Sequence, residues 1–575
     1  MPPRPSADAV PLRAWQRRAL VAYLRSRDTD FLAVATPGAG KTTFALRIAA
    51  ELLAAGTVQT VTVVAPTEHL KTQWAAAAAR TGIALDPDFR NSQLHTAADF
   101  DGVVVTYAQV GMAPAVHRRR TLARRSLVIL DEVHHAGDAR TWGDGVKQAF
   151  EPAVRRLALT GTPFRSDENP IPFVTYERDP DGLLRSRSDS VYGYAEALAD
   201  GVVRPVIFLA YSGEARWRTS AGDELVARLG EPLTNDVTAK AWRTALDPKG
   251  DWIPQVLRAA DARLRHKRAA GMTDAAGLVI ATDQTAARAY AKRLAEITGN
   301  SPVVVLSDDT GASERIAKFT ESDDRWLVAV RMVSEGVDIP RLAVGVYATS
   351  ASTPLYFAQA IGRFVRTRRT GETASVFLPS VPPLLELASA MEVERDHVLG
   401  QKADDGLDDG LLEAAQRQQD EATDQPPAFE ALAATAELDQ VIFDGNSFGT
   451  PILAGSPEEE DFLGLPGLLT QEQVAAVLRK RQAEQLAAQK RASTSAGDGS
   501  EKAGGTELPE SAMTTGQRRQ TLRKHLNALV AAEHRKSERP HGQIHAELRR
   551  ICGGPPSAQA TMEQLEARIA AIQSW

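Results

Sequence analysis

A glycine-rich stretch near the N-terminus contains the residues best suited to chemistry. Residues 35–43 read Ala-Thr-Pro-Gly-Ala-Gly-Lys-Thr-Thr; they follow the apolar run 31–34 and open a helical pattern that continues to about residue 55. In this order of strand, glycine-rich turn and helix, backbone N–H groups can point at phosphate oxygens, and the helix N-terminus adds partial positive charge. Lys41 can reach the β- and γ-phosphates of a nucleotide, and the Thr42 hydroxyl can bind Mg²⁺.

The stretch predicts a nucleotide-binding loop rather than a strand-to-helix turn that is glycine-rich by coincidence. It departs from the usual pattern at one position, because Ala35 stands where the first glycine of such loops is found. The residues expected to bind the nucleotide are Pro37, Gly38, Ala39, Gly40, Lys41, Thr42 and Thr43.

Two adjacent carboxylates follow another apolar run. Residues 127–130 are Leu-Val-Ile-Leu, typical of a buried strand, and Asp131 and Glu132 come directly after them. Asp131 would bind Mg²⁺ through water, and Glu132 would orient or deprotonate the water that attacks a γ-phosphate. A pair of solvated acids at a strand end is the alternative, and the phosphate loop upstream disfavours it.

Arginines in the second half of the chain supply the opposite charge. Gln359, Arg363 and Arg366 are spaced i, i+4 and i+7, so a helix over 356–366 would place them on one face. The planar, charged fork of arginine suits the charge that develops on a transferring phosphoryl group. Alone this could be an ordinary basic helix face. Together with Lys41 and the carboxylates it predicts one shared phosphate site.

The elements that must position these residues form two series of strands alternating with helical patterns. The β-branched runs predict two mostly parallel sheets covered by helices, with ligands at the carboxyl ends of the strands. The second series has no phosphate loop, so it is expected to serve the first. The runs are 61–65, 103–106, 127–130 and 157–160, then 206–210, 278–281, 303–306, 327–330, 344–348 and 375–378.

The sequence Asp-Glu-Val-His at 131–134 resembles the DExH motif of superfamily 2 helicases, and the other motifs of that family follow in its order. Their wording is closest to DNA repair helicases of the RadD and XPB kind and to restriction-enzyme motor subunits. The resemblance covers roughly residues 11–380. The matching segments are 65–67 with Gln73-Trp74 (motif Ia), 105–107 (Ib), 159–165 (III), 334–340 (V) and 359–366 (VI).

This resemblance implies two tandem RecA-like domains that hold ATP and Mg²⁺ between them, with Arg363 and Arg366 as arginine fingers. Gln16 would hydrogen-bond to the edge of adenine. Gly336 would allow close approach to the backbone near the cleft, and Asp338 would contact the ribose or a neighbouring arginine. His134 would link the two halves. The residues implied to lie along the nucleic acid are Thr67, Thr106, Tyr107 and Thr162.

Composition restricts the remaining possibilities. The 575-residue chain is 43% hydrophobic, carries a net charge of −6 and has one cysteine, Cys552, which excludes disulfides within the chain and cysteine-rich zinc sites. We see no signal peptide and no apolar run long enough to span a membrane, so we expect a cytoplasmic protein with no membrane partner. Because the net charge is negative, any basic surface that binds nucleic acid must be confined to part of the molecule. The run 117–125 could lie along DNA, but we favour a solvated helix face.

The chain is expected to begin with a disordered segment, residues 1–10, followed by RecA-like domains at 11–190 and 200–385. Residues 386–492 should form an acidic, partly helical extension, and 493–511 a flexible linker. A basic helical module at 512–575 would complete a mostly helical C-terminal part. This module could bind nucleic acid or a protein partner, or be a plain helical bundle, and the sequence favours neither.

The family resemblance implies an ATP-hydrolysing DNA helicase or translocase that moves 3′ to 5′ along, or unwinds, nucleic acid in repair, recombination, replication or defence. Its DNA could be single-stranded, branched or duplex. Three alternatives stay open: a duplex-DNA motor of a restriction or defence complex, an RNA helicase, and an ATP-driven remodeller that does not translocate. Contacts to phosphates would make binding largely blind to sequence and sensitive to salt.

Overall fold

The computed structural model describes most of the chain, in two compact units, Met1–Leu486 and Ala487–Trp575. Among the predicted functional residues, Thr162, Gly336 and Asp338 lie outside the described residues, as do the predicted N-terminal segment 1–10 and all but the first three residues of the predicted linker. The described residues are 11–93, 97, 99–134, 140–161, 170–178, 184–219, 224–231, 233–306, 311–330, 339–369, 371–391, 398–399, 429–444, 446–449, 451–465, 469, 471–495, 526, 529–530, 541–553 and 562–573.

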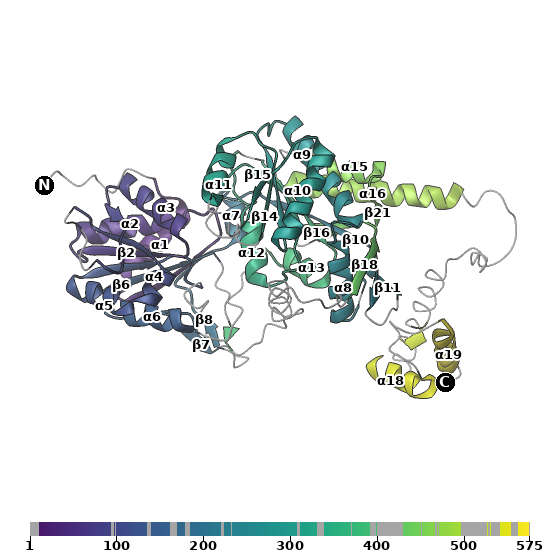
Figure 1. Ribbon diagram of the computed structural model, residues 1–575, viewed down its shortest axis with the longest axis horizontal. Coiled ribbons are helices and arrows are strands. Elements are labelled where there is room, and N and C mark those ends of the chain that lie inside the picture. Colours follow the sequence, from purple (N-terminus) through teal and green to yellow (C-terminus); the bar gives the residue numbers. More distant parts are fainter. Residues whose placement is uncertain are drawn as a thin grey trace. The chain divides into compact units, whose positions relative to one another are not determined.

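The first sheet is entirely parallel, as the sequence predicts (Figure 1). Its seven strands lie in the order β3-β4-β2-β5-β6-β1-β9. β-branched residues favour these strands, and successive side chains enter opposite cores. The strands are β1 (Asp30–Ala35), β2 (Thr60–Ala65), β3 (Leu85–Asp86), β4 (Gly102–Thr106), β5 (Ser126–Leu130), β6 (Arg155–Thr160) and β9 (Ser190–Tyr192).

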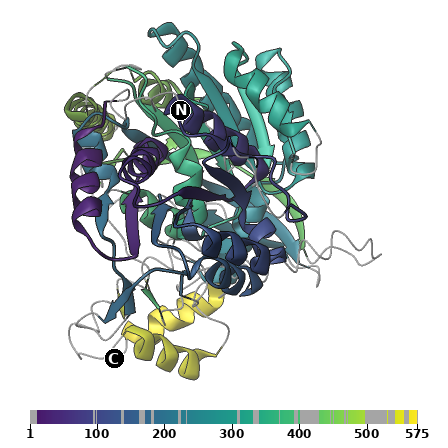
Figure 2. The same cartoon turned by 90° about the vertical axis from the view of Figure 1, so that its left-hand side faces the viewer.

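Helices cover both faces of this sheet, and together with it they form the first lobe (Figure 2). Val63 and Ile129 face the core built by the first three helices, whereas Val64 and Leu130 face the core of the next three. Burial on both faces explains the continuous apolar runs in the sequence. The helices are α1 (Ala14–Arg25), α2 (Lys41–Ala54), α3 (Glu68–Arg80), α4 (Tyr107–Met112), α5 (Pro114–Ala123) and α6 (Arg140–Phe150).

The second sheet, the centre of the second lobe, has a parallel part and an antiparallel part. Its parallel order is β13-β14-β12-β15-β16-β10, without a glycine-rich phosphate loop after any described strand. The strands are β10 (Val206–Thr219), β12 (Ala276–Ala281), β13 (Val303–Val305), β14 (Trp326–Val330), β15 (Leu342–Ala348) and β16 (Ala374–Pro379). The helices are α8 (Asn235–Ala245), α9 (Trp252–Ala269), α10 (Gln284–Thr298), α11 (Ala312–Glu321), α12 (Pro354–Gly362) and α13 (Pro382–Ser389).

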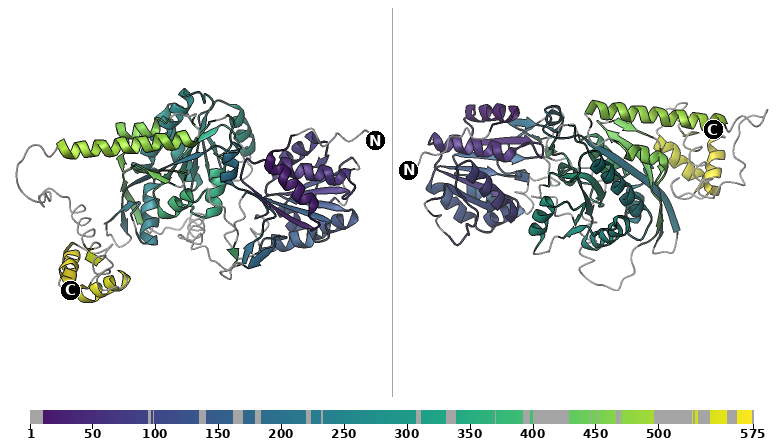
Figure 3. Two further views of the ribbon diagram at one scale, coloured as in Figure 1. Left: turned by 180° about the vertical axis from the view of Figure 1, so that it is seen from behind. Right: turned by 90° about the horizontal axis from the view of Figure 1, so that it is seen from above.

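The segment that follows is partly helical, as expected, but it also contributes four short strands to the second sheet. Together with β11, from earlier in the chain, these strands add an antiparallel part to the sheet through β10. Two helices follow, and Figure 3 shows the second as one continuous run that includes the first three residues of the predicted linker. These elements are β11 (Glu224–Leu229), β18 (Phe429–Ala434), β19 (Glu437–Phe443), β20 (Asn446–Phe448), β21 (Ile452–Leu453), α15 (Pro457–Leu463) and α16 (Gln471–Ser495).

A small three-stranded sheet and the second unit complete the description. The small sheet is made of β7 (Tyr176–Arg178), β8 (Leu184–Ser186) and β17 (Val398–Leu399). In the second unit, α18 (His541–Cys552) and α19 (Met562–Gln573) pack around a core that includes Leu548 and Leu565. Over the described part of the chain, every helix is too short or too polar to cross a bilayer.

Candidate active site

The loop between β1 and α2 has the backbone that its glycines were expected to provide. Gly38 and Gly40 have φ angles of 80° and 91°, in the left-handed region that side chains rarely adopt. Ala35 needs no such freedom, because it is still in β1 and pairs with Tyr192. This explains why the chain tolerates alanine where related loops begin with glycine. Lys41, the first residue of α2, places Nζ 3.3 Å from the Ala35 carbonyl oxygen.

The other loop residues lie where the prediction needs them. Pro37 immediately precedes the first left-handed glycine, and Ala39 is fully buried between the two. Thr42 and Thr43 are half-buried in the first turn of α2. The N–H groups of this turn and of the loop are those that a phosphate chain can bind.

Side chains at the start of α1 hold the loop by donating hydrogen bonds to the carbonyl oxygens of the loop. Gln16 Nε2 donates to the Gly40 oxygen at 2.9 Å, and Gln16 Oε1 accepts from the Arg13 backbone at 2.8 Å. Arg13 Nη1 donates to the oxygens of Gly38 and Ala39 at 2.9 and 2.8 Å. In this structure the Gln16 amide, expected to read adenine, is therefore occupied by the loop.

Two loop-holding residues were missed by sequence reasoning. Besides Arg13, Trp15 donates from Nε1 to the Ala39 oxygen at 3.1 Å and stacks on Tyr192, with ring centroids 5.0 Å apart. Both residues flank Gln16 in the segment 12–16, so their position beside the motif was the only available signal.

The carboxylates emerge at the end of β5 beside Lys41. Glu132 Oε1 pairs with Lys41 Nζ at 2.7 Å, and Glu132 Oε2 accepts from the Gly161 N–H at 3.0 Å. Glu132 has a φ of 44°, an uncommon backbone for a side chain of this size. Such strain is found at functional sites, where the surrounding structure maintains it.

Asp131 is held from a different side. Its Oδ2 accepts from Trp74 Nε1 at 2.7 Å, and its backbone oxygen accepts from the Tyr107 hydroxyl at 2.9 Å. Trp74 comes from α3, which the motif resemblance located without giving the tryptophan a role. These two contacts join the ends of three neighbouring strands at the predicted metal-binding carboxylate.

Burial and neighbouring charges separate the two carboxylates chemically. Burial and then the Glu132 charge raise the pKa of Asp131 to about 6. Burial would also raise the pKa of Glu132, but the Lys41 ammonium holds it at about 2. Two adjacent acids with different proton affinities can take different roles, one binding a cation and one polarising water.

The donor set fits Mg²⁺ bound together with a nucleotide. Asp131 is a buried carboxylate whose side-chain donor is a neutral indole, so a cation would offset the cost of its burial. No cluster of three or more metal-binding side chains occurs among the residues that the structure describes. One carboxylate with substrate phosphates is how Mg²⁺ is commonly held.

His134 connects the two lobes through the site. Its Nδ1 lies 3.0 Å from Thr160 Oγ1, and its Nε2 lies 3.3 Å from Nε2 of Gln359 in α12. An amide nitrogen can only donate, so His134 Nε2 accepts and its Nδ1 carries the proton toward Thr160. His134 is 2% exposed, and it contacts both lobes as its motif resemblance implied.

The arginine segment lies against the phosphate loop. A Cβ added to Gly362 would be 2.8 Å from Pro37 Cγ, and one added to Gly38 would be 4.0 Å from the Arg366 Cα. Desolvation, and then the positive charge of Arg13, lower the pKa of Arg366. Cations from both lobes therefore converge here, and a polyanion would relieve their repulsion.

The expected helix over 356–366 is shorter than predicted. Helix α12 ends at Gly362, Arg363 is its C-cap, and Arg366 forms a β-bridge with Val203. The three side chains do not share one helix face, because the backbone leaves the helix before Arg366. Beyond the helix, the Phe364 and Val365 oxygens accept hydrogen bonds from Arg204.

The predicted nucleic-acid contacts need correction at Tyr107. It is 1% exposed and bonded to Asp131, so its side chain faces the core instead of a strand of nucleic acid. Thr106 Oγ1 caps α4 by accepting from the Gln109 N–H at 3.1 Å, and its own O–H can still donate to a phosphate, so its contact stays a prediction. Thr67, at the N-cap of α3, has a buried hydroxyl without a hydrogen-bond partner, so it remains a candidate.

The basic run in α5 is largely structural. His117 is buried against Asn91, Arg118 pairs with Glu151, and Arg120 stacks over Phe89 with its guanidinium 4.3 Å from the ring centroid. These contacts agree with the solvated-face interpretation more than with a surface reserved for DNA.

Comparisons with known proteins support the motif assignment. Residues 9–165 match the family model described as the res subunit of type III restriction enzymes. The chain is also 25% identical to the DNA 3′–5′ translocase XPB2 of Sulfurisphaera tokodaii over 381 residues, covering 63% of this chain and 80% of that protein. These two likenesses support a helicase of superfamily 2.

The matched relatives are a translocase of the XPB kind and the res subunit of restriction enzymes. The chain is 61% identical over 564 residues to the uncharacterized protein Rv2917 of Mycobacterium tuberculosis H37Rv, covering 98% of this chain and 92% of that protein, and belongs to the same family. Among solved structures it resembles the type ISP restriction-modification enzyme LlaBIII bound to DNA, with 13% identity, a TM-score of 0.48, and coverage of 96% of this chain and 37% of that one.

Proposed function

We propose that this protein is a nucleic-acid-dependent ATP hydrolase, a helicase or translocase that couples hydrolysis to movement along DNA. The observation that carries the proposal is the approach of Gly362 to Pro37, which brings the arginine segment of the second lobe against the phosphate loop of the first. Helicase chemistry needs both halves: a loop with carboxylates, and arginines that stabilise charge on the transferring phosphoryl group.

The resting contacts suggest how ATP would start the reaction. Lys41 is paired with Glu132, so a triphosphate entering the loop would compete for the Lys41 ammonium. Glu132 would then be free to orient the attacking water, and its low pKa keeps it anionic. Mg²⁺, held by Asp131 and the Thr42 hydroxyl, would neutralise charge on the β- and γ-phosphates.

The second lobe would complete the site. Arg363 and Arg366 would contact the γ-phosphate, and Gln359 would report its state through His134 to Thr160. Hydrolysis removes the γ-phosphate contacts, so the cleft would close with ATP and open after it. Alternating grip by the two lobes would then step the protein along a strand.

DNA is the proposed partner, and 3′ to 5′ the proposed direction. The likeness to XPB2, a protein named as a DNA 3′–5′ translocase, supports both. We place the halves of the motor at residues 11–190 and 200–385, and assign the basic C-terminal module to contacts with DNA or a protein partner. An RNA helicase, a motor that pumps duplex DNA and a remodeller that does not translocate remain the alternatives that the test below distinguishes.

The test is ATP hydrolysis measured without nucleic acid and with single-stranded DNA, duplex DNA and RNA, beside strand-displacement and triplex-displacement assays. We expect stimulation by DNA, and Lys41→Ala and Glu132→Gln to abolish turnover while the protein stays folded. Triplex displacement without unwinding would favour the duplex motor, and neither activity with intact hydrolysis would favour the remodeller. Unchanged turnover in either variant would refute the assignment.

A further inference from the structure

The connector between the two sheets, residues 190–204, is bonded at both ends to the proposed ATP site. At its start β9 pairs with β1, and the Thr36 N–H of the phosphate loop donates to the Tyr192 oxygen at 3.0 Å. At its end Val203 forms a β-bridge with Arg366. Eleven residues after Tyr192, the chain thus reaches the arginine segment directly.

Arg204, the last residue of the connector, holds the backbone of that segment. Its N–H donates to the Val365 oxygen and its Nε to the Phe364 oxygen, both at 2.7 Å. Its Nη2 donates to the Leu342 oxygen at the start of β15. Arg204 is 1% exposed, so these carbonyl groups have no water to replace it. Three consecutive residues, 364–366, are therefore fastened to the connector.

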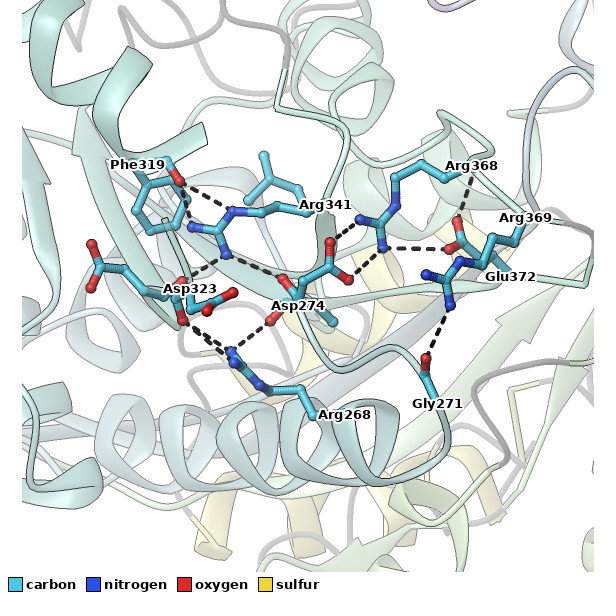
Figure 4. A network of polar contacts seen from close by, with 12 residues as sticks. Arg268, Gly271, Asp274, Phe319, Asp323, Arg341, Arg368, Arg369 and Glu372 are labelled. Atoms are coloured by element: carbon cyan, nitrogen blue, oxygen red, sulfur yellow. Dashed lines mark hydrogen bonds and ion pairs between the residues drawn. The ribbon is translucent and has the colours of Figure 1, made fainter. Parts of the chain in front are cut away.

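Glu372 completes the arrangement from the other side. Its Oε2 lies 3.2 Å from Arg204 Nη1 and accepts from the Arg368 N–H at 3.1 Å, and its side chain is fully buried. Arg368 also pairs with Asp274, which precedes β12 (Figure 4). The loop that follows the arginine pair is thus tied to Arg204 and to the body of the second lobe.

This fastening opposes a repulsion inside the site. Arg366 and Arg13 are cations close enough for the charge of Arg13 to lower the pKa of Arg366. Without restraint, a flexible segment would carry its arginines away from the other cations. The buried pair of Arg204 and Glu372 resists this displacement, because breaking it would leave an uncompensated buried charge.

We propose that Arg204 is a positioning residue: paired with Glu372, it fixes residues 364–366 and thereby directs Arg363 and Arg366 at the phosphate loop. This proposal rests on the ATP-hydrolysing function proposed above. It extends that function because the connector would link the phosphate-binding loop to the arginines that contact the phosphates.

The test compares Arg204→Gln and Glu372→Gln with a matched control, Arg263→Gln. Arg263 is as buried as Arg204 and donates to Ser375 Oγ and to the oxygens of Leu463 and Leu465, away from the arginine segment. We expect kcat to fall about 10- to 100-fold in the first two variants, with the KM for ATP little changed, because a small misplacement of a catalytic group is costly. Arg263→Gln should lower the melting temperature without this selective loss.

Testing Arg204→Gln in a protein that already lacks Arg366 distinguishes a positioning role from a general loss of structure. If Arg204 acts through Arg366, then Arg204→Gln should cost little more in an Arg366→Ala protein, measured by single-turnover hydrolysis. If the rate of the double variant falls by the product of the two single-variant losses, the proposal is overturned. The same selective loss in Arg263→Gln would also overturn it.

Arg204→Lys covers the possibility that Arg204→Gln fails to fold. Lysine keeps the charge opposite Glu372 but lacks the fixed fork that reaches the Phe364 oxygen, so we expect a folded protein with reduced kcat. Wild-type kcat in folded Arg204→Lys would refute the positioning role. Absence of hydrolysis by the wild type, or equal hydrolysis by wild type and Lys41→Ala, would instead refute the underlying function, and this proposal with it.

Discussion

Replacing Gly362 by alanine should lower activity far more than stability. Gly362 is the last residue of α12, where alanine is favoured over glycine by up to about 1 kcal/mol. The added Cβ, however, would lie 2.8 Å from Pro37 Cγ and 3.1 Å from Pro37 Cβ. Carbon atoms prefer about 3.5–4.0 Å, so the helix or the loop must move by roughly 1 Å. Proline is a stiff ring that cannot rotate away.

A shift of this size acts on the arginines next to it. Misplacement by about 1 Å can cost about 100-fold in rate, so we expect kcat to fall by that order. The melting temperature should change little, because the gain in helix propensity offsets part of the cost of displacing Pro37. The assay is steady-state ATP hydrolysis with saturating DNA, beside a melting curve for each protein.

Gly56→Ala is the matched control for this experiment. Gly56 has a φ of 65° and no atoms within 4 Å of an added Cβ. Alanine there should cost about 1–2 kcal/mol of stability through backbone strain and leave kcat unchanged, the reverse of the Gly362 result. If Gly362→Ala hydrolyses ATP at the wild-type rate, the second lobe does not bear on the phosphate loop during catalysis, and the reasoning is refuted.

Two further predictions concern the first lobe. Trp74→Phe keeps an aromatic ring but removes the N–H that bonds Asp131, so the Mg²⁺ concentration for half-maximal hydrolysis should rise about 10- to 100-fold. The control Trp252→Phe loses a hydrogen bond to the Ser212 oxygen elsewhere and should leave that concentration unchanged. An unchanged Mg²⁺ requirement in Trp74→Phe would count against the role of Trp74. Burial, and then the charge of Arg120, lower the pKa of His117 to about 4 from an ordinary value of 6.5. The unfolded chain therefore takes up the proton first as pH falls, and wild type should lose about 2 kcal/mol more of its free energy of unfolding between pH 7 and pH 5 than His117→Gln does. Parallel pH profiles from denaturant titrations of the two proteins would contradict this.

Sequence reasoning found the parts of the site that depend on local pattern. The phosphate loop, the carboxylates after β5 and the two strand series follow from short-range rules on glycine, β-branched runs and strand ends. Convergence of Lys41 and the arginines also followed, since each motif had a defined place at the edge of its sheet.

The parts that sequence reasoning missed depend on long-range contacts. The hydrogen bonds from Arg204 to the Phe364 and Val365 oxygens, just beyond the end of α12, come from far away along the chain, and no local pattern reveals them. Tyr107 was expected to contact nucleic acid, but the direction of a side chain just past a strand is set by packing, here against Asp131. The strands in residues 429–453 were missed because their acidic composition masked a short apolar alternation.

The central claim is that one triphosphate is shared between the loop of the first lobe and the arginines of the second. Its most direct test measures ATP binding and single-turnover hydrolysis separately for Arg363→Ala and Arg366→Ala. We predict that hydrolysis falls at least about 1,000-fold in one or both variants, as for other arginine fingers, while ATP still binds. Hydrolysis at the wild-type rate in both variants would contradict the account.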